Sequence, residues 1–289
     1  MTSLNIPCLI IHKGYKPYLK SNLEITSKNN KIYIIGDSTI QKLEKINENI
    51  TFINIKEYEN NSTIKSLKKS YINYSTNNSI FEWECFQRPF IMQQFAKEQN
   101  YEKVFHIDSD NILLININSL IFEKEIAYCV PSFQDNLRMD SSIHCGLLSE
   151  KFFENYKKLY IDIFENKSKF DLIENKIHHH KKNNLKGGIC DMTFYYLLQK
   201  LNMIYPQNLL APIKNDKGDE FIFINNLNTP VGFFSLNNFK TNSKNLIKIY
   251  KGNLVKDIVN NKFIRIANIH FQGKSKKYLN MTTKYKLKY

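Results

Sequence analysis

Two acidic side chains follow an apolar run in the middle of the chain. The segment KVFHIDSDNILL (103–114) carries Asp108 and Asp110 with only Ser109 between them. A carboxylate is costly to bury unless a cation pairs with it. Two carboxylates directed at one point therefore indicate a divalent cation, and their hard oxygen ligands favour Mg²⁺ or Mn²⁺, which would also bridge a diphosphate. The alternative is that Asp108 caps a turn and Asp110 is solvated, because a lone D-x-D arises often by chance.

A histidine near the C-terminus could complete such a site. In IHFQGKSKK (269–277), His270 ends an apolar run, and Gly273 and a cluster of lysines follow it. An imidazole suits Mn²⁺, and Lys274 could reach phosphate oxygens beside a glycine that allows close backbone approach. The alternative is a core histidine next to a basic surface loop.

Two further residues carry charge at informative positions. KGGICDM (186–192) is a flexible turn that leads to Asp191 at the start of a helix, where an ordinary N-cap is the simpler interpretation. Arg88 lies on the helix that precedes the D-x-D strand, and its guanidinium is suited to bidentate contacts with phosphate or sugar. Arg88 could instead pair with Glu82 or Glu84 on its own helix.

The elements that must position these residues alternate between strands and helices. Apolar, β-branched runs predict strands, and 3.6-residue periodicity predicts helices, so we expect an α/β fold with a mostly parallel central sheet. Ligands bind beyond the carboxyl ends of the strands in such sheets. We expect strands at 7–12, 31–37, 51–55, 103–107, 126–130 and 263–271, and helices between the first two strands and at 81–100, 149–166 and 191–201. We expect 167–184 to be a polar surface excursion, with the three histidines 178–180 in a solvated loop.

Composition limits the class of protein. The chain has 289 residues, 42% of them hydrophobic, and a net charge of +14, which favours anionic partners unless it reflects codon bias alone. Its five cysteines are scattered and form no C-x-x-C pair, so we expect neither a disulfide framework nor a zinc site. The apolar stretch near the N-terminus is too short for a signal peptide or a membrane span, and we expect a cytoplasmic protein.

These motifs, in this order, resemble the GT-A fold nucleotide-sugar glycosyltransferases. The closest likeness is to the family 8 type, which includes glycogenin and bacterial lipooligosaccharide galactosyltransferases. The opening IPCLIIHKGYKPYL and IYIIGD also resemble bacterial polysaccharide glycosyltransferases, whose first strand cradles the nucleotide base. The elements that carry the resemblance are Arg88, DSD (108–110), HCGLLSEKF (144–152), GGICDM (187–192) and HFQGKSK (270–276).

The resemblance implies a single GT-A domain over residues 1–277, with a nucleotide-binding half to about 125 and an acceptor-binding half from 126, followed by a tail at 278–289. It implies Mn²⁺ or Mg²⁺, a nucleotide-sugar donor (UDP-sugar favoured, GDP-sugar possible) and a glycan or lipid-linked saccharide acceptor. Asp191 would act as a base or bind sugar hydroxyls. The implied metal ligands are Asp108, Asp110 and His270, and the implied donor contacts are His12, Lys13, Gly14, Asp37, Arg88, Asp108, Ser109, Asp110, Gly273 and Lys274.

The chain departs from the family pattern in three places. His144-Cys145-Gly146 stands where the family has Asn-Ala-Gly, Asp191-Met192 replaces an Asp-Gln pair, and the usual Pro-Trp after the late lysine is absent. Acceptor identity and stereochemistry therefore stay open.

Two other functions fit the charge pattern. One is a metal-dependent nucleotidyltransferase or phosphodiesterase, which would need a second carboxylate pair or a phosphate-binding glycine loop. The other is a basic nucleic-acid-binding protein, which we do not expect because the aromatic residues have core-forming spacings and no recognised nucleic-acid motif occurs. The basic, aromatic tail from Lys274 to Tyr289 could contact an anionic inner membrane face, or could be a frayed, lysine-rich terminus.

Overall fold

The computed structural model describes residues 5–132, 134–224, 249–257, 260–277 and 279. Its central sheet has seven strands in the order β3-β2-β1-β4-β7-β6-β8. The β3-β2-β1-β4 pairs are parallel, β7 runs antiparallel to both β4 and β6, and β8 is parallel to β6. The expected mostly parallel α/β sheet is thus confirmed. Its strands are β1 Cys8–His12, β2 Ile32–Gly36, β3 Ile50–Asn54, β4 Lys103–Ile107, β6 Ala127–Cys129, β7 Ser142–Ser149 and β8 Gln207–Asn208.

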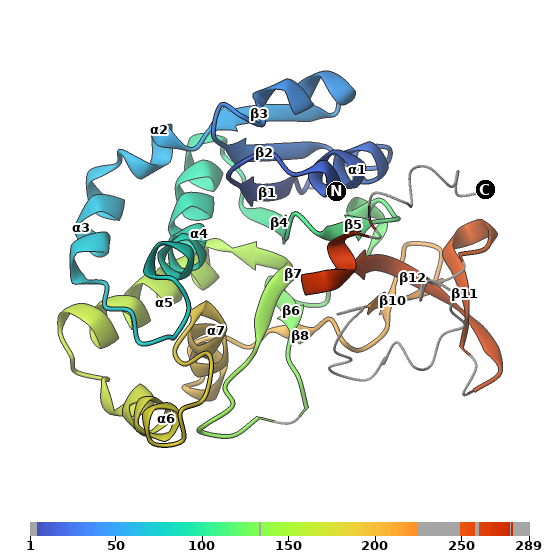
Figure 1. Ribbon diagram of the computed structural model, residues 1–289. Helices are drawn as coiled ribbons and strands as arrows, with labels where there is room; N and C mark the ends of the chain where they lie inside the picture. The colour runs from blue at the N-terminus through green and yellow to red at the C-terminus, as the bar shows by residue number, and fades with distance from the viewer. Residues whose placement is uncertain (1–4, 133, 225–248, 258–259, 278, 280–289) are drawn as a thin grey trace.

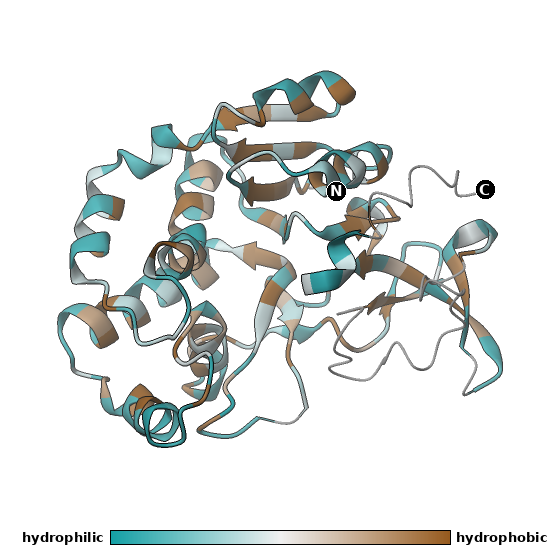
Figure 2. Cartoon of the chain, in the orientation of Figure 1, coloured by the Kyte–Doolittle hydropathy of each residue, from teal (hydrophilic) through white to brown (hydrophobic). Residues whose placement is uncertain are grey.

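Side chains of the central strands alternate between two hydrophobic layers, as a period of two requires. Leu9 and Tyr33 pack with helices α4, α5 and α7, whereas Ile10 and Ile34 pack with α1. Figure 1 shows helices α3 to α7 on one side of the sheet, and Figure 2 shows hydrophobic residues concentrated on the strands. The helices are α1 Pro17–Thr26, α2 Lys56–Glu59, α3 Ser62–Ser70, α4 Ser79–Glu98, α5 Glu150–Tyr160, α6 Asp171–Lys182 and α7 Asp191–Lys200, and a π-helical turn, Ile161–Glu165, extends α5.

The expected helices at 81–100, 149–166 and 191–201 correspond to α4, α5 and α7. Pro89 lies inside α4, between buried Phe86 and Phe90. On α5, Phe152, Tyr156 and Tyr160 are all fully buried, as their spacing of four residues predicts.

The prediction for residues 167–184 was wrong, because most of this segment forms α6. Ile173 and Ile177 lie one helical turn apart and are buried, together with Lys176. These two isoleucines are outnumbered by lysines and histidines, so the sequence of this segment is similar to that of a polar loop. The three histidines 178–180 are therefore helical.

A second, smaller sheet was not anticipated. It has the order β11-β12-β10-β9, and β5 also pairs with β12. The predicted late strand is confirmed as β12, but it belongs to this second sheet (Figure 1). The strands are β5 Asn111–Leu113, β9 Ile213–Lys214, β10 Glu220–Ile224, β11 Leu254–Asp257 and β12 Lys262–His270.

Among the described residues, no helix combines the length and apolar character needed to cross a membrane. The predicted tail at 278–289 lies outside the described residues apart from Leu279, which is buried.

Candidate active site

The D-x-D triplet is the turn that joins the two sheets. Strand β4 of the central sheet ends at Ile107, and β5 of the second sheet begins at Asn111. Asn22, fully buried on α1, holds this turn through its side-chain amide, which donates to the Ser109 carbonyl at 2.9 Å and to the Asn111 carbonyl at 3.0 Å. The turn is therefore fixed by hydrogen bonds from a neighbouring helix.

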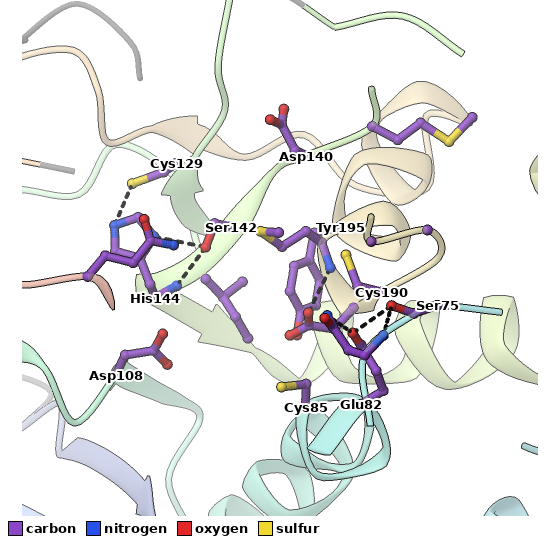
Figure 3. A pocket seen from close by; sticks show the side chains of 18 of the residues that line it. Ser75, Glu82, Cys85, Asp108, Cys129, Asp140, Ser142, His144, Cys190 and Tyr195 are labelled. Atoms are coloured by element: carbon purple, nitrogen blue, oxygen red, sulfur yellow. Dashed lines mark hydrogen bonds between the residues drawn. The ribbon is translucent and has the colours of Figure 1, made fainter. Parts of the chain in front are cut away.

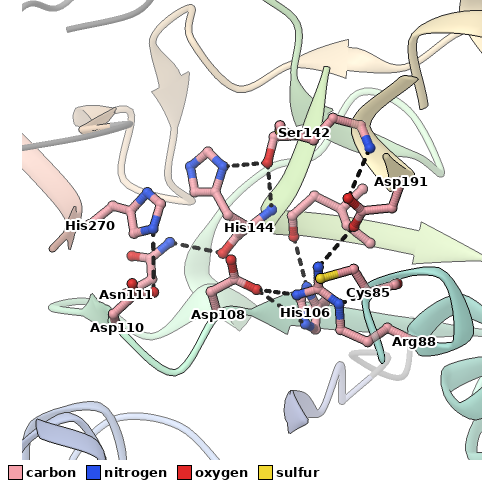
Figure 4. Close-up of polar contacts among 12 residues, drawn as sticks. Cys85, Arg88, His106, Asp108, Asp110, Asn111, Ser142, His144, Asp191 and His270 are labelled. Atoms are coloured by element: carbon pink, nitrogen blue, oxygen red, sulfur yellow. Dashed lines mark hydrogen bonds and ion pairs between the residues drawn. The ribbon is translucent and has the colours of Figure 1, made fainter. Parts of the chain in front are cut away.

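Pairing between β5 and β12 brings the late histidine to this turn. His270 is the register partner of Asn111, and the Phe271 N–H donates to the Asp110 carbonyl at 2.8 Å. The His270 Nε2 atom lies 3.3 Å from Asp110 Oδ1, and Asp108, Asp110 and His270 each offer a ligand atom within 4.8 Å of the others. Two carboxylates and an imidazole make a donor set suited to Mn²⁺ (Figure 4).

Arg88 holds Asp108 in its charged form. Its Nη1 atom lies 2.6 Å from Asp108 Oδ1, and His106 Nε2 lies 3.9 Å from the same oxygen. Burial acts to raise the pKa of Asp108, but the Arg88 guanidinium and the neighbouring histidines together outweigh burial, so this pKa lies well below its ordinary value. His106 is fully buried and burial lowers its pKa, which keeps its ring neutral beside Arg88.

Asp110 has a different pair of partners. Besides His270, it contacts Lys276, whose Nζ lies 2.9 Å from Asp110 Oδ2. Burial opposes ionisation, but the hydrogen bond with His270 and the charge of Lys276 lower the pKa of Asp110 overall. Lys274, the lysine expected to contact phosphate, is exposed and does not line the adjacent cavity, whereas Lys276 does.

The ring of His144 forms a platform for His270. The two rings stack with centroids 4.4 Å apart and planes 12° from parallel. Burial and the neighbouring His270 lower the pKa of His144 to about 3, so its ring is neutral. Its Nδ1 contacts Ser142 Oγ at 2.8 Å, and its carbonyl accepts from the Asn111 amide at 3.0 Å. His144 thereby orients the proposed metal ligand without adding charge.

Asp191 is the first residue of α7, and Cys190 is the N-cap. The Asp191 Oδ2 atom lies 2.8 Å from Arg88 Nη2 and accepts a hydrogen bond from the Tyr195 hydroxyl at 3.1 Å. The Asp191 Oδ1 atom accepts from the Met192 N–H at 3.0 Å. Arg88 therefore bridges Asp108 and Asp191 (Figure 4). It pairs with neither Glu82 nor Glu84.

The glycine turn before Asp191 allows two segments to approach closely. Gly188 has φ +138°, and an added Cβ would lie 2.3 Å from the Tyr74 carbonyl oxygen. Gly188 also forms an antiparallel bridge with Ser75. This position therefore requires glycine, and the contact fixes the segment before α4 against the start of α7.

A cavity of about 800 Å³ adjoins Arg88, Asp191 and the cluster of Asp108, Asp110 and His270. Figure 3 shows its wall, built from α4, β7, α7 and the segment around Ser75. The ionisable residues on it include Glu82, Arg88, Asp108, Asp110, Asp140, His144, Lys176, Asp191, His270 and Lys276.

The predicted donor contacts at the start of the chain form a separate group. The Gly14 N–H donates to Asp37 Oδ2 at 2.7 Å, and Gly14 adopts φ +76°. Lys13 is paired with Glu59 at 2.6 Å and Glu84 at 3.1 Å.

None of His12, Lys13, Gly14 and Asp37 lines the cavity, and neither do Ser109 and Gly273. Burial lowers the pKa of His12. The charges of Lys276 and Asp110 also act on this pKa, because His12 lies near the D-x-D turn.

Sequence reasoning missed Asn22 and Lys276. A signal for Asn22 exists in the sequence, because Asn22 and Thr26 on α1 and Asn30 just after it follow one another at intervals of four. Thr26 Oγ1 accepts from the Leu113 N–H at 3.1 Å, and Asn30 donates to the Ile115 carbonyl at 2.9 Å. This polar stripe binds the backbone that follows the D-x-D turn.

No family model and none of the curated proteins matches the sequence. Among solved structures, the chain is similar to PaToxG glycosyltransferase, with 18% identity, 69% of this chain and 70% of the other covered, and a TM-score of 0.41. It is similar to the apo form of the glycosyltransferase GlyE of Streptococcus pneumoniae TIGR4, at 14% identity and a TM-score of 0.38, covering 70% of this chain but 44% of GlyE. A glycosyltransferase involved in glycosylation of the major capsid of PBCV-1 matches at 9% identity and a TM-score of 0.41 over 96% and 98% of the two chains.

Proposed function

We propose that this protein is a metal-dependent glycosyltransferase of GT-A type that moves a sugar from a nucleotide-sugar, with UDP-sugar favoured, to a glycan or a lipid-linked saccharide. The observation that carries the proposal is the Asp108, Asp110 and His270 cluster. It lies beside a cavity of about 800 Å³, large enough for a sugar and its acceptor.

The residues fit a divalent cation. Asp108, Asp110 and His270 would hold Mn²⁺ or Mg²⁺, and the neutral His144 ring would orient His270. When bound, the cation supplies Lewis-acid neutralisation of the departing diphosphate. Arg88 and Lys276 compensate the two carboxylates, and His270 contacts Asp110, so the ligand groups are already held together.

The chain's own cations would contact the donor. Transfer breaks the bond between the anomeric carbon and a phosphate oxygen, and negative charge then grows on the diphosphate. Lys276 on one side of the carboxylate pair and Arg88 on the other could stabilise that charge, and Lys274 extends the basic segment. His12, Lys13, Gly14, Asp37, Ser109 and Gly273 are the proposed contacts for the remainder of the nucleotide.

Asp191 holds Arg88 and lines the cavity, so we assign it to the sugar-binding wall. Contact of the C-terminal tail with an anionic membrane is part of the same proposal, because lipid-linked acceptors lie at such surfaces.

Donor hydrolysis across UDP-, GDP- and CMP-sugars, with Mn²⁺ or with EDTA, tests the function. We expect one nucleotide-sugar to release free sugar and nucleoside diphosphate only with Mn²⁺. Release of nucleoside monophosphate and sugar phosphate would instead identify a phosphodiesterase. No turnover together with salt-sensitive binding of DNA or RNA would identify a nucleic-acid-binding protein.

A further inference from the structure

Among the lysine and arginine side chains that line the cavity, Lys176 on α6 has unusual partners. The other three have a carboxylate partner each: Arg88 with Asp108 and Asp191, Lys276 with Asp110, and Arg138 with Asp140. Within the described part of the chain, no carboxylate oxygen lies within 4 Å of the Lys176 Nζ atom. Its ammonium group is therefore held by neutral groups alone.

Two neutral oxygens fix the position of this ammonium group. The Lys176 Nζ atom donates to the Arg138 carbonyl at 2.8 Å and to Thr193 Oγ1 at 3.1 Å. An ammonium group has three N–H donors, and these are the hydrogen bonds that it makes to residues the structure describes. One donor is thus left for a ligand in the cavity that Lys176 lines.

The burial of Lys176 is costly for stability alone. Lys176 is 4% exposed and lies on the face of α6 that also buries Ile173 and Ile177. An ammonium group that is buried among neutral partners costs free energy, which an apolar residue at this position would avoid. Burial lowers the pKa of Lys176, and nearby negative charges such as Asp140 only partly oppose this effect. The positive charge is therefore incompletely compensated, which favours binding of an anion.

A series of contacts connects Lys176 to the proposed metal ligands. Thr193, which accepts from Lys176 at 3.1 Å, lies in the first turn of α7, two residues after Asp191. Asp191 Oδ2 lies 2.8 Å from Arg88 Nη2, and Arg88 Nη1 lies 2.6 Å from Asp108 Oδ1. Along this series, Asp191 and Arg88 lie between Lys176 and Asp108. Because the donor diphosphate would bind at the cation, Lys176 is placed for the acceptor.

We propose that Lys176 binds a negatively charged group of the acceptor, which is the carboxylate of an acidic sugar or a phosphate. The inference rests on the proposed glycosyltransferase function. The ammonium group donates its third hydrogen bond to this anion, and the anion supplies the negative charge that the surrounding residues lack. A neutral glycan leaves the buried ammonium group uncompensated and binds less tightly.

Three sugars with the same ring test this proposal: glucose, glucuronic acid and glucose 6-phosphate. Each is titrated into protein that is saturated with Mn²⁺ and UDP, so that the sugar phosphate cannot occupy the donor site, and ligand-observed NMR gives the affinity. We expect a charged sugar to bind about tenfold more tightly than glucose. Preference for glucuronic acid identifies an acidic sugar as the acceptor group, and preference for glucose 6-phosphate identifies a phosphate.

Two variants remove the charge of Lys176 in different ways. Lys176→Met keeps the apolar length of the side chain, and Lys176→Gln keeps a hydrogen-bond donor. In both variants the affinity for the charged sugar should fall about tenfold, while the affinities for glucose and for UDP with Mn²⁺ stay within about twofold. Lys182→Met, an exposed change on the same helix, is the control and should keep the wild-type preference.

Equal affinity of the wild-type protein for the three sugars overturns the proposal. So does a preference for the charged sugar that persists in both variants, because other cations then provide it. A lower melting temperature together with weaker UDP binding in both variants marks a structural role for Lys176 and also overturns the proposal. If the wild-type protein binds no UDP with Mn²⁺, the proposed glycosyltransferase function itself fails, whereas failure of the Lys176 assignment alone leaves UDP binding intact.

Discussion

Asn111 and His270 are register partners across β5 and β12, two strands from opposite halves of the sequence. The Asn111 side chain also accepts from the Asn268 amide at 2.7 Å and donates to the His144 carbonyl at 3.0 Å. Strand pairing and a buried amide network, rather than loop contacts, therefore set the spacing between the D-x-D turn and the histidine.

We predict that Asn111→Ala destabilises the protein by about 2–4 kcal/mol, because the buried Asn268 amide and His144 carbonyl each lose a partner. Urea unfolding measures this change. Asn166→Ala, at an exposed position that ends a helical turn, is the control and should stay within about 0.5 kcal/mol of wild type. Wild-type stability in Asn111→Ala would show that the network does not hold the site.

Arg88→Lys should weaken UDP binding in the presence of Mn²⁺ by roughly ten- to a hundredfold. A lysine has one ammonium group and cannot reproduce the fork that contacts Asp108 at 2.6 Å and Asp191 at 2.8 Å. Isothermal titration gives the affinity, and Arg265→Lys, at a partly exposed surface pair, is the matched control. Equal UDP affinity in the two variants would remove Arg88 from the donor site.

The two lysines after Gly273 should behave differently. Lys276→Ala removes a positive charge 2.9 Å from Asp110, so Mn²⁺ alone should bind more tightly, while UDP in the presence of Mn²⁺ binds about tenfold more weakly. Lys274→Ala, at an exposed position, should change both affinities less. Electron paramagnetic resonance of free Mn²⁺ and UDP titration separate the two effects. The opposite ranking of the variants would support Lys274 as the phosphate contact.

Much of the fold could be predicted from local patterns. The apolar, β-branched runs in β1 and β2 and the run VFHI in β4 mark strands directly, and Phe152, Tyr156 and Tyr160 mark a helix face. The prediction for residues 167–184 was wrong because two isoleucines among charged neighbours give only a weak helical pattern. The helix there depends on tertiary packing.

The main residues of the candidate site could be predicted from the sequence, but the contacts between them could not. Asp108, Asp110 and His270 were predicted to share one ion, and the structure brings them together. Lys276, and not Lys274, contacts Asp110. This contact depends on the 3₁₀ turn at Gly273–Ser275, which no periodicity in the sequence predicts. Glu82 was considered as a partner for Arg88, but Arg88 pairs with Asp108 and Asp191.

The central claim is that Asp108, Asp110 and His270 hold a divalent cation that binds a nucleotide diphosphate. Titration of UDP into the wild-type protein, with Mn²⁺ and then with EDTA, tests it most directly, with Asp110→Asn and His270→Ala as the paired variants. The account predicts that UDP binds with Mn²⁺, that EDTA abolishes binding, and that both variants lose Mn²⁺-dependent binding while keeping the wild-type circular dichroism spectrum. Equal UDP affinity in Mn²⁺ and EDTA, or wild-type affinity in both variants, would contradict it.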